Sequence, residues 1–128
     1  MAAKKRRILV IEDEEEYRKL QRRVLEKAGY EMLEAATGAE GLALFASSDP
    51  DLILLDVVLP DMLGFDVRRK MRPKAGRKLP PVLFCTVRSA AASLAEGVSL
   101  GSADYVLKPF DPADLLARVK DALENAGA

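Results

Sequence analysis

The chain has 128 residues, with 20 basic and 20 acidic side chains, one cysteine and no histidine. This length suits one domain with its own core, and the cancelling charges exclude a strong overall field for nucleic acid or a membrane surface. A lone cysteine excludes a disulfide framework, and the four apolar residues before Glu12 are too few for a secretory or membrane-spanning segment. We therefore expect one cytoplasmic domain over residues 1–128, with its core at about 6–125.

The first third of the chain contains two strand signals separated by a helix signal. An apolar run predicts a strand at Ile8–Ile11, and a short second strand is expected at about Glu31–Ala35. Between them, Glu14–Glu16 suits a helix N-terminus, and Gly29 suits the residue after a helix C-terminus. The residues expected to face the core from this helix are Tyr17, Leu20, Val24 and Ala28.

The middle of the chain repeats this alternation. Thr37–Glu40 is a capping-box sequence that predicts the start of a helix, and Asp49-Pro50 predicts its end. A third strand is expected at Leu52–Leu55. A third helix is expected at about Gly64–Arg72, because a proline follows it.

The last third contains two further strands and two further helices. A strand at Pro81–Cys85, an alanine-rich helix at about Ala90–Leu100 and a strand at Tyr105–Leu107 are expected in turn. Asp111-Pro112 supplies an N-cap and a first-turn proline for the final helix. The residues expected to face the core from that helix are Leu115, Leu116, Val119 and Leu123.

Strictly alternating strands and helices predict an α/β fold with a doubly wound, five-stranded parallel sheet and helices on both faces. The expected strand order is 2-1-3-4-5, that of a flavodoxin-like three-layer sandwich. In this order the first, third, fourth and fifth strands are neighbours. Residues at their carboxyl ends should therefore meet at one edge of the sheet.

Polar side chains stand at these four strand ends. Glu12 and Asp13 follow the first strand, Asp56 the third, Thr86 the fourth and Lys108 the last. Carboxylates without histidine or thiolate favour a hard cation such as Mg²⁺. Asp56 could then attack phosphorus, while Lys108 pairs with the phosphoryl group and Thr86 hydrogen-bonds it. Each residue alone has an ordinary explanation as a cap, a solvated charge or a strand residue, but independent caps do not explain the set.

Motifs at these positions carry a family resemblance. They are Ile8–Asp13, Asp51–Pro60, Gly64, Thr86 and Gly101–Phe110. Over about Arg6–Asn125 the chain resembles the receiver domain of two-component response regulators. The resemblance implies that Asp56 is the phosphoacceptor and that Mg²⁺ is bound by Glu12, Asp13, Asp56 and the backbone carbonyl of Val58. It also implies that Thr86 and Lys108 contact the phosphoryl group, that Thr86 and Tyr105 act as switch residues, and that the Lys108–Pro109 peptide bond is cis.

The resemblance further implies a partner and a reaction. The phosphoryl group comes from a phosphohistidine on a sensor histidine kinase or a histidine phosphotransfer protein, and the donor cannot lie in this chain because it has no histidine. The domain is a signalling protein that catalyses phosphorylation and dephosphorylation of its own aspartate, rather than an enzyme with a separate substrate. Its output face comprises the helix at about 90–100, the following strand and the last helix, and a homodimer through this face is an open alternative.

The residues after Thr86 depart from the family pattern. Receiver domains usually have alanine or glycine there, whereas this chain has Val87 followed by Arg88. Two successive β-branched residues would crowd the entrance to Asp56. We therefore expect Val87 to alter the lifetime of the acyl phosphate.

The charge of two segments bears on partners. Arg68–Lys78 holds seven basic residues among eleven without interleaved aromatics, which favours a solvated face over a nucleic-acid site. Asp104, Asp114 and Arg118 match charged positions used for pairing in receiver dimers. Ser89–Leu107 contains no lysine or arginine, so the basic partner of that pairing is missing. An apolar contact through the alanine-rich helix is the alternative.

Three other functions share part of this pattern. A flavodoxin-like electron carrier needs a phosphate loop after the first strand, where Glu12–Glu16 would repel a flavin phosphate. A phosphatase with an aspartyl nucleophile usually has a second acid two residues later, where this chain has Val58. A receiver-like scaffold that works without phosphorylation typically loses pocket residues, and none is lost here. The sequence is compatible with a stand-alone receiver or the receiver piece of a longer regulator.

Overall fold

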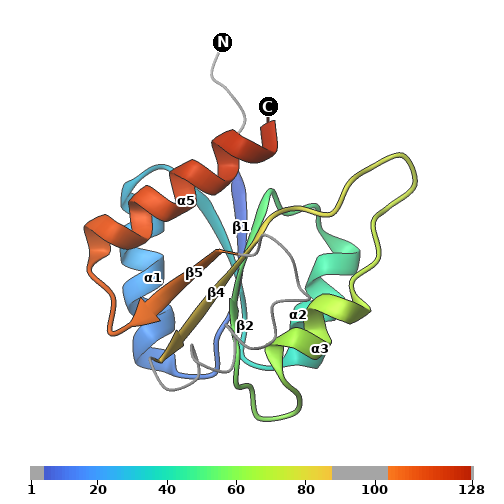
Figure 1. Ribbon diagram of the computed structural model, residues 1–128, viewed down its shortest axis with the longest axis horizontal. Helices are drawn as coiled ribbons and strands as arrows, with labels where there is room; N and C mark the ends of the chain where they lie inside the picture. Colours follow the sequence, from blue (N-terminus) through green and yellow to red (C-terminus); the bar gives the residue numbers. More distant parts are fainter. Residues whose placement is uncertain (1–4, 88–103, 128) are drawn as a thin grey trace.

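The apolar runs form a parallel sheet in the computed structural model, which describes residues 5–87 and 104–127. The sheet has five strands in the order β2-β1-β3-β4-β5, which confirms the expected topology (Figure 1). The strands are β1 (Arg7–Ile11), β2 (Glu31–Ala35), β3 (Leu52–Asp56), β4 (Val82–Val87) and β5 (Asp104–Lys108). Their register brings neighbouring carboxyl ends level, since Ile11 pairs with Leu55 and Val87 pairs with Lys108.

Helices cover both faces of the sheet. Those described are α1 (Glu15–Lys27), α2 (Gly38–Ser47), α3 (Gly64–Lys70) and α5 (Pro112–Gly127). α1 and α5 lie on one face, and α2 and α3 lie on the other (Figure 1). The helix expected at Ala90–Leu100 lies outside the described residues. Within residues 5–87 and 104–127, no helix has the length and apolar character needed to cross a bilayer.

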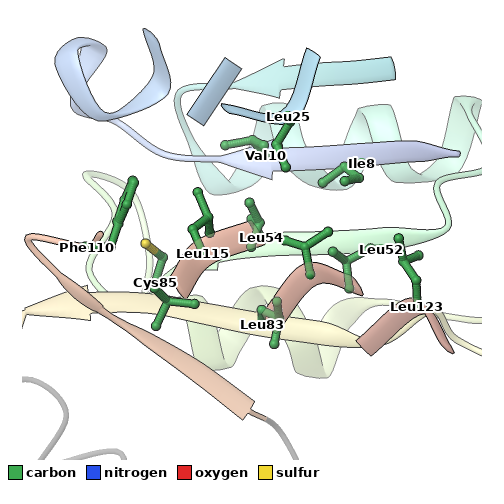
Figure 2. Close-up of a cluster of buried hydrophobic side chains, with 12 residues drawn as sticks. Ile8, Val10, Leu25, Leu52, Leu54, Leu83, Cys85, Phe110, Leu115 and Leu123 are labelled. Carbon is green, nitrogen blue, oxygen red and sulfur yellow. The ribbon is translucent and has the colours of Figure 1, made fainter. Parts of the chain in front are cut away.

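Each face of the sheet has its own hydrophobic core, because successive strand residues point to opposite sides. On β1, Ile8 and Val10 pack toward α1 and α5, whereas Leu9 and Ile11 pack toward α2 and α3. Figure 2 shows the first of these clusters. β3 is buried over all five residues, which explains why its sequence is apolar up to Asp56. Burial stabilises the folded state by about 1.5–3 kcal/mol for each fully buried aliphatic side chain. The two cores therefore hold the strands, and the carboxyl edge of the sheet, in fixed positions.

The C-terminus of α1 and the N-terminus of α2 lie where local sequence motifs predict them. Gly29 has a φ of 94°, and its N–H donates to the carbonyl of Glu26 while the next N–H donates to that of Leu25. These two bonds close α1 in a Schellman motif. Thr37 Oγ1 accepts a hydrogen bond of 3.1 Å from the Glu40 N–H and opens α2.

The third helix is shorter than expected. α3 ends at Lys70 rather than Arg72, because Met71 already has extended backbone angles (φ −69°, ψ 135°). This conformation buries the Met71 side chain to 2% exposure. Arg72 precedes Pro73, which disfavours a helical conformation there as well. The end of α3 therefore coincides with the burial of Met71 and comes before Pro73.

Two predicted helix faces also needed correction. In α1, the expected residues Tyr17, Leu20 and Val24 pack against the core, but Ala28 is exposed. The fully buried residues of this helix are Gln21 and Leu25. The apolar pattern missed Gln21 because its side chain is polar. In α5, Leu116 is only half-buried, while the other three predicted residues are buried as expected.

Candidate functional site

Three of the predicted site residues lie buried at the carboxyl edge of the sheet. Glu12 directly follows β1, Asp56 is the last residue of β3 and Lys108 is the last residue of β5. Their exposed fractions are 1%, 7% and 5%, respectively. Charged residues are rarely so buried unless they are paired. The edge therefore holds a group of mutually dependent charges.

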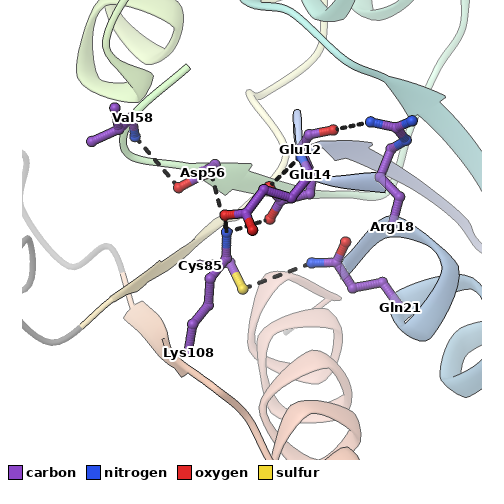
Figure 3. Close-up of polar contacts among 8 residues, drawn as sticks. All are labelled: Glu12, Glu14, Arg18, Gln21, Asp56, Val58, Cys85 and Lys108. Atoms are coloured by element: carbon purple, nitrogen blue, oxygen red, sulfur yellow. Dashed lines mark hydrogen bonds and ion pairs between the residues drawn. The ribbon is translucent and has the colours of Figure 1, made fainter. Parts of the chain in front are cut away.

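Lys108 lies at the centre of this group. Its Nζ is 2.6 Å from Glu12 Oε1 and donates to Asp56 Oδ2 at 3.1 Å, with Glu14 Oε1 at 3.7 Å (Figure 3). Nζ also lies 4.5 Å from the centre of the Tyr17 ring, a cation–π distance. The expected cis peptide bond between Lys108 and Pro109 is present. One ammonium group thus connects the ends of three separate chain segments.

Glu12 is held on several sides. Its Oε2 accepts a hydrogen bond of 3.1 Å from the Glu14 N–H, and its backbone carbonyl accepts one of 2.6 Å from Arg18 Nη1. Its own N–H donates to the carbonyl of Ala35 at 3.0 Å. These bonds fix the turn between β1 and α1, so the carboxylate has little freedom to move away from Lys108 (Figure 3).

Burial and neighbouring charge perturb both members of this pair. Burial, with the nearby charge of Asp56 adding to it, raises the pKa of Glu12 to about 7 against the lowering effect of Lys108. Burial by itself lowers the pKa of Lys108, but hydrogen bonds and charges of Glu12 and Asp56 outweigh it and raise that pKa. Lys108 therefore remains a cation, and one cation does not fully offset the surrounding carboxylates.

The donor set fits a hard divalent cation. Carboxylate oxygens of Glu12, Asp13, Glu14 and Asp56 lie within 4.8 Å of one another. Two of these residues are buried and two are exposed, so the cluster is open to solvent on one side. Oxygen ligands with room for several waters are what Mg²⁺ prefers. Glu14 was not predicted as part of this cluster, because an acidic residue before a helix is already explained by the helix dipole.

The segment after Asp56 runs close beside the site. The Val58 N–H donates to Asp56 Oδ1 at 3.4 Å, and the Val58 side chain is 56% exposed. The Gly64 N–H donates to the carbonyl of Val57 at 2.7 Å. A Cβ at Gly64 would lie 2.2 Å from the backbone oxygen of Asp56, so only glycine allows this approach.

The remaining predicted residues lie on β4 and β5. Thr86 pairs with Leu107 in the sheet, and its side chain lies outside the described residues, as does all of Arg88. Val87 is 45% exposed at the end of β4, and Tyr105 is 41% exposed on β5. The structure thus places Val87 in the strand position opposite Lys108.

Charges outside the site are paired locally in several places. Arg118 Nε lies 3.2 Å from Asp114 Oδ2 within α5, and the side chain of Asp104 lies outside the description. In the basic segment after α3, Arg77 and Lys74 form ion pairs with Asp49. Such exposed pairs contribute little to stability and are typical of a solvated surface.

Comparison with known proteins is consistent with this geometry. A family model described as the response regulator receiver domain matches residues 8–120. The transcriptional regulatory protein ResD of Bacillus subtilis is 38% identical over 120 residues, covering 94% of this chain and 49% of ResD. The phosphate regulon transcriptional regulatory protein PhoB of Pseudomonas aeruginosa is 35% identical over 120 residues, covering 94% of this chain and 52% of PhoB. The chain spans about half the length of these curated relatives.

Solved structures show the same fold. The chemotaxis response regulator CheY4 of Vibrio cholerae superposes with a TM-score of 0.83 at 30% identity, covering 93% of this chain and 99% of that one. A CheY-like response regulator receiver domain protein from Methanospirillum hungatei gives a TM-score of 0.82 at 30% identity, covering 95% and 96% of the two chains.

Proposed function

The chain belongs to the response regulator receiver domain family, and on this premise we propose that Asp56 accepts a phosphoryl group from a phosphohistidine of a partner protein. As a receiver domain of a two-component system, it acts with a histidine kinase or a histidine phosphotransfer protein. The observation that supports the proposal best is the buried arrangement of Asp56, Glu12 and Lys108 at the carboxyl edge of the sheet.

The reaction is a phosphoryl transfer between proteins. A carboxylate oxygen of Asp56 forms a P–O bond as the P–N bond of the phosphohistidine breaks, and the electron pair of that bond leaves with the partner's imidazole. Lys108, whose Nζ is 3.1 Å from Asp56 Oδ2, remains positive and balances the charge of the incoming group. The Val58 N–H, 3.4 Å from Oδ1, orients the carboxylate. These residues contribute positioning and charge, which dominate catalysis of phosphoryl transfer.

The acidic cluster has a separate role. We assign Mg²⁺ binding to Glu12, Asp13, Asp56 and the backbone carbonyl of Val58, with Glu14 in the same cluster. A bound divalent cation would neutralise carboxylate and phosphoryl oxygens together, which is the chemistry it supplies in such sites. The clustering of these carboxylates around one ammonium group supports the assignment, because carboxylates so close together stay ionised only when further positive charge joins them.

The output of the reaction is a change at the surface that includes β5 and α5. We assign the hydroxyl of Thr86 a contact to the phosphoryl group and propose that Tyr105 turns inward when Thr86 moves. The two residues lie on neighbouring strands, and Tyr105, at 41% exposure, has solvent-facing area to lose. We also propose that a homodimer can form through this surface. Any activity of a longer regulator that contains this domain is likewise a proposal.

Intact-mass analysis tests the phosphoacceptor directly. The wild type with acetyl phosphate and Mg²⁺ is expected to gain one phosphoryl group, which Asp56→Asn abolishes. Asp66→Asn is the matched control, because Asp66 is an aspartate on α3 that pairs with Arg69 away from the site. A wild type without adduct, under conditions that label an ordinary receiver, would contradict the proposal and favour the phosphorylation-independent scaffold.

A further inference from the structure

Asp61 connects the loop after β3 to the first turn of α2. It lies in the connection between β3 and α3, and its two carboxylate oxygens accept hydrogen bonds from the first turn of α2. Asp61 Oδ1 is 2.8 Å from the Gly38 nitrogen, and Oδ2 is 2.9 Å from the Ala39 nitrogen. These bonds lower the pKa of Asp61, so the carboxylate is ionised at neutral pH. A charged acceptor at a helix N-terminus is a favourable arrangement.

The helix does not depend on Asp61 for its local cap. Thr37 is the N-cap of α2 and accepts a hydrogen bond from Glu40 at 3.1 Å. Asp61 accepts hydrogen bonds from the N–H groups of Gly38 and Ala39, which lie 23 and 22 residues away along the chain. A cap from so distant a segment constrains that segment as well as the helix.

The constrained segment, residues 57–63, begins immediately after the phosphoacceptor. It is tied at its ends by the hydrogen bond from the Gly64 N–H to Val57, and within by a 3.2 Å bond from the Leu59 N–H to Met62. It also packs tightly on α2, since a Cβ at Gly38 would lie 2.6 Å from Met62 Cγ. Asp61 therefore fastens a compact loop to a helix whose inner face is part of the core.

We propose that Asp61 is a positioning residue for the metal site, holding residues 57–63 against α2 so that the Val58 backbone stays beside the acidic cluster. The inference rests on the proposed function, because it assigns a role toward the Mg²⁺ that Asp56 and its neighbours would bind. Asp61 does not itself belong to the cluster whose oxygens lie within 4.8 Å. Its effect is transmitted through the backbone of the loop.

The test compares two capping variants of the same helix. Asp61→Ala removes the cap that includes the loop, and Thr37→Ala removes the cap that does not. Isothermal titration with MgCl₂ is expected to show about a tenfold weaker Kd for Asp61→Ala, the usual size of the effect when support behind a metal ligand is lost. Thr37→Ala is expected to bind Mg²⁺ as the wild type does, although both variants lose a helix cap. Asp61→Asn, which keeps one acceptor oxygen, should lie between the wild type and Asp61→Ala.

Amide hydrogen exchange gives a second measurement that does not depend on the metal. Exchange of the Leu59 and Gly64 amides should be faster in Asp61→Ala than in the wild type and unchanged in Thr37→Ala. Equal Mg²⁺ affinity in the wild type and Asp61→Ala, or an equal loss in both capping variants, would overturn the inference. A wild type that binds no Mg²⁺ would instead contradict the proposed metal site, and the two failures are thereby distinguished.

Discussion

Replacement of Lys108 by methionine removes the cation that connects Glu12 and Asp56 while keeping a side chain of similar length. At an effective dielectric constant of about 20, unit charges separated by 2.6 and 3.1 Å attract by roughly 6 and 5 kcal/mol. Most of this attraction is offset by the cost of removing the charges from water. What remains for the variant is the cost of two buried carboxylates without their partner, which is about 3 kcal/mol for a site open on one side.

Urea unfolding in EDTA measures this loss. With an m value of about 2 kcal/mol/M, Lys108→Met should lower the midpoint by about 1.5 M. Added Mg²⁺ should restore part of the loss, because binding to the native state alone stabilises it. Lys120→Met is the control, since Lys120 is exposed on α5 and its replacement should change stability by less than about 0.5 kcal/mol.

A double-mutant cycle separates the pair from the rest of the site. Glu12→Gln combined with Lys108→Met should show a coupling energy of about 2 kcal/mol, because each change alone leaves the other group without its nearest partner. A loss below about 1 kcal/mol for Lys108→Met in EDTA, or additive single changes, would refute the reasoning that the pair is a buried, mutually dependent unit.

Two further substitutions and one labelling experiment test other parts of the structure. Under the proposed function, Val87→Ala should shorten the lifetime of the acyl phosphate at Asp56, because Val87 is 45% exposed at the strand end opposite Lys108 and a smaller side chain there would admit water more readily. Equal decay rates would contradict this. Gly64→Ala should destabilise the domain by about 2 kcal/mol or more in urea unfolding, since its Cβ would lie 2.2 Å from a backbone oxygen; a neutral result would mean that the loop moves freely. Cys85, at 1% exposure and with its thiol pKa raised to about 12 by burial, should resist iodoacetamide at pH 8 and react fully in urea, as judged by mass; rapid native labelling would argue against a closed core.

Sequence patterns predicted the elements of the described residues and their order well because the signals involved are local. A buried parallel strand is an apolar run, as in β3, and a helix end is a short chemical motif, as at Gly29 and Thr37. Each depends on residues within a few positions of one another. The predictions failed where burial depends on contacts between residues far apart in the sequence. Gln21 is buried despite its polarity, and Met71 ends α3 early because its side chain enters the core.

The amino-acid sequence alone was sufficient to place polar residues at the ends of neighbouring strands, because alternating elements predict a doubly wound parallel sheet and the flavodoxin-like order sets these strands side by side. It could not indicate how those residues share their charges. Only the folded chain shows that Lys108 lies between Glu12 and Asp56, that Glu14 joins the acidic cluster and that Asp61 binds the first turn of α2. These contacts join segments far apart in the chain, so they depend on register and loop packing, which no local pattern encodes.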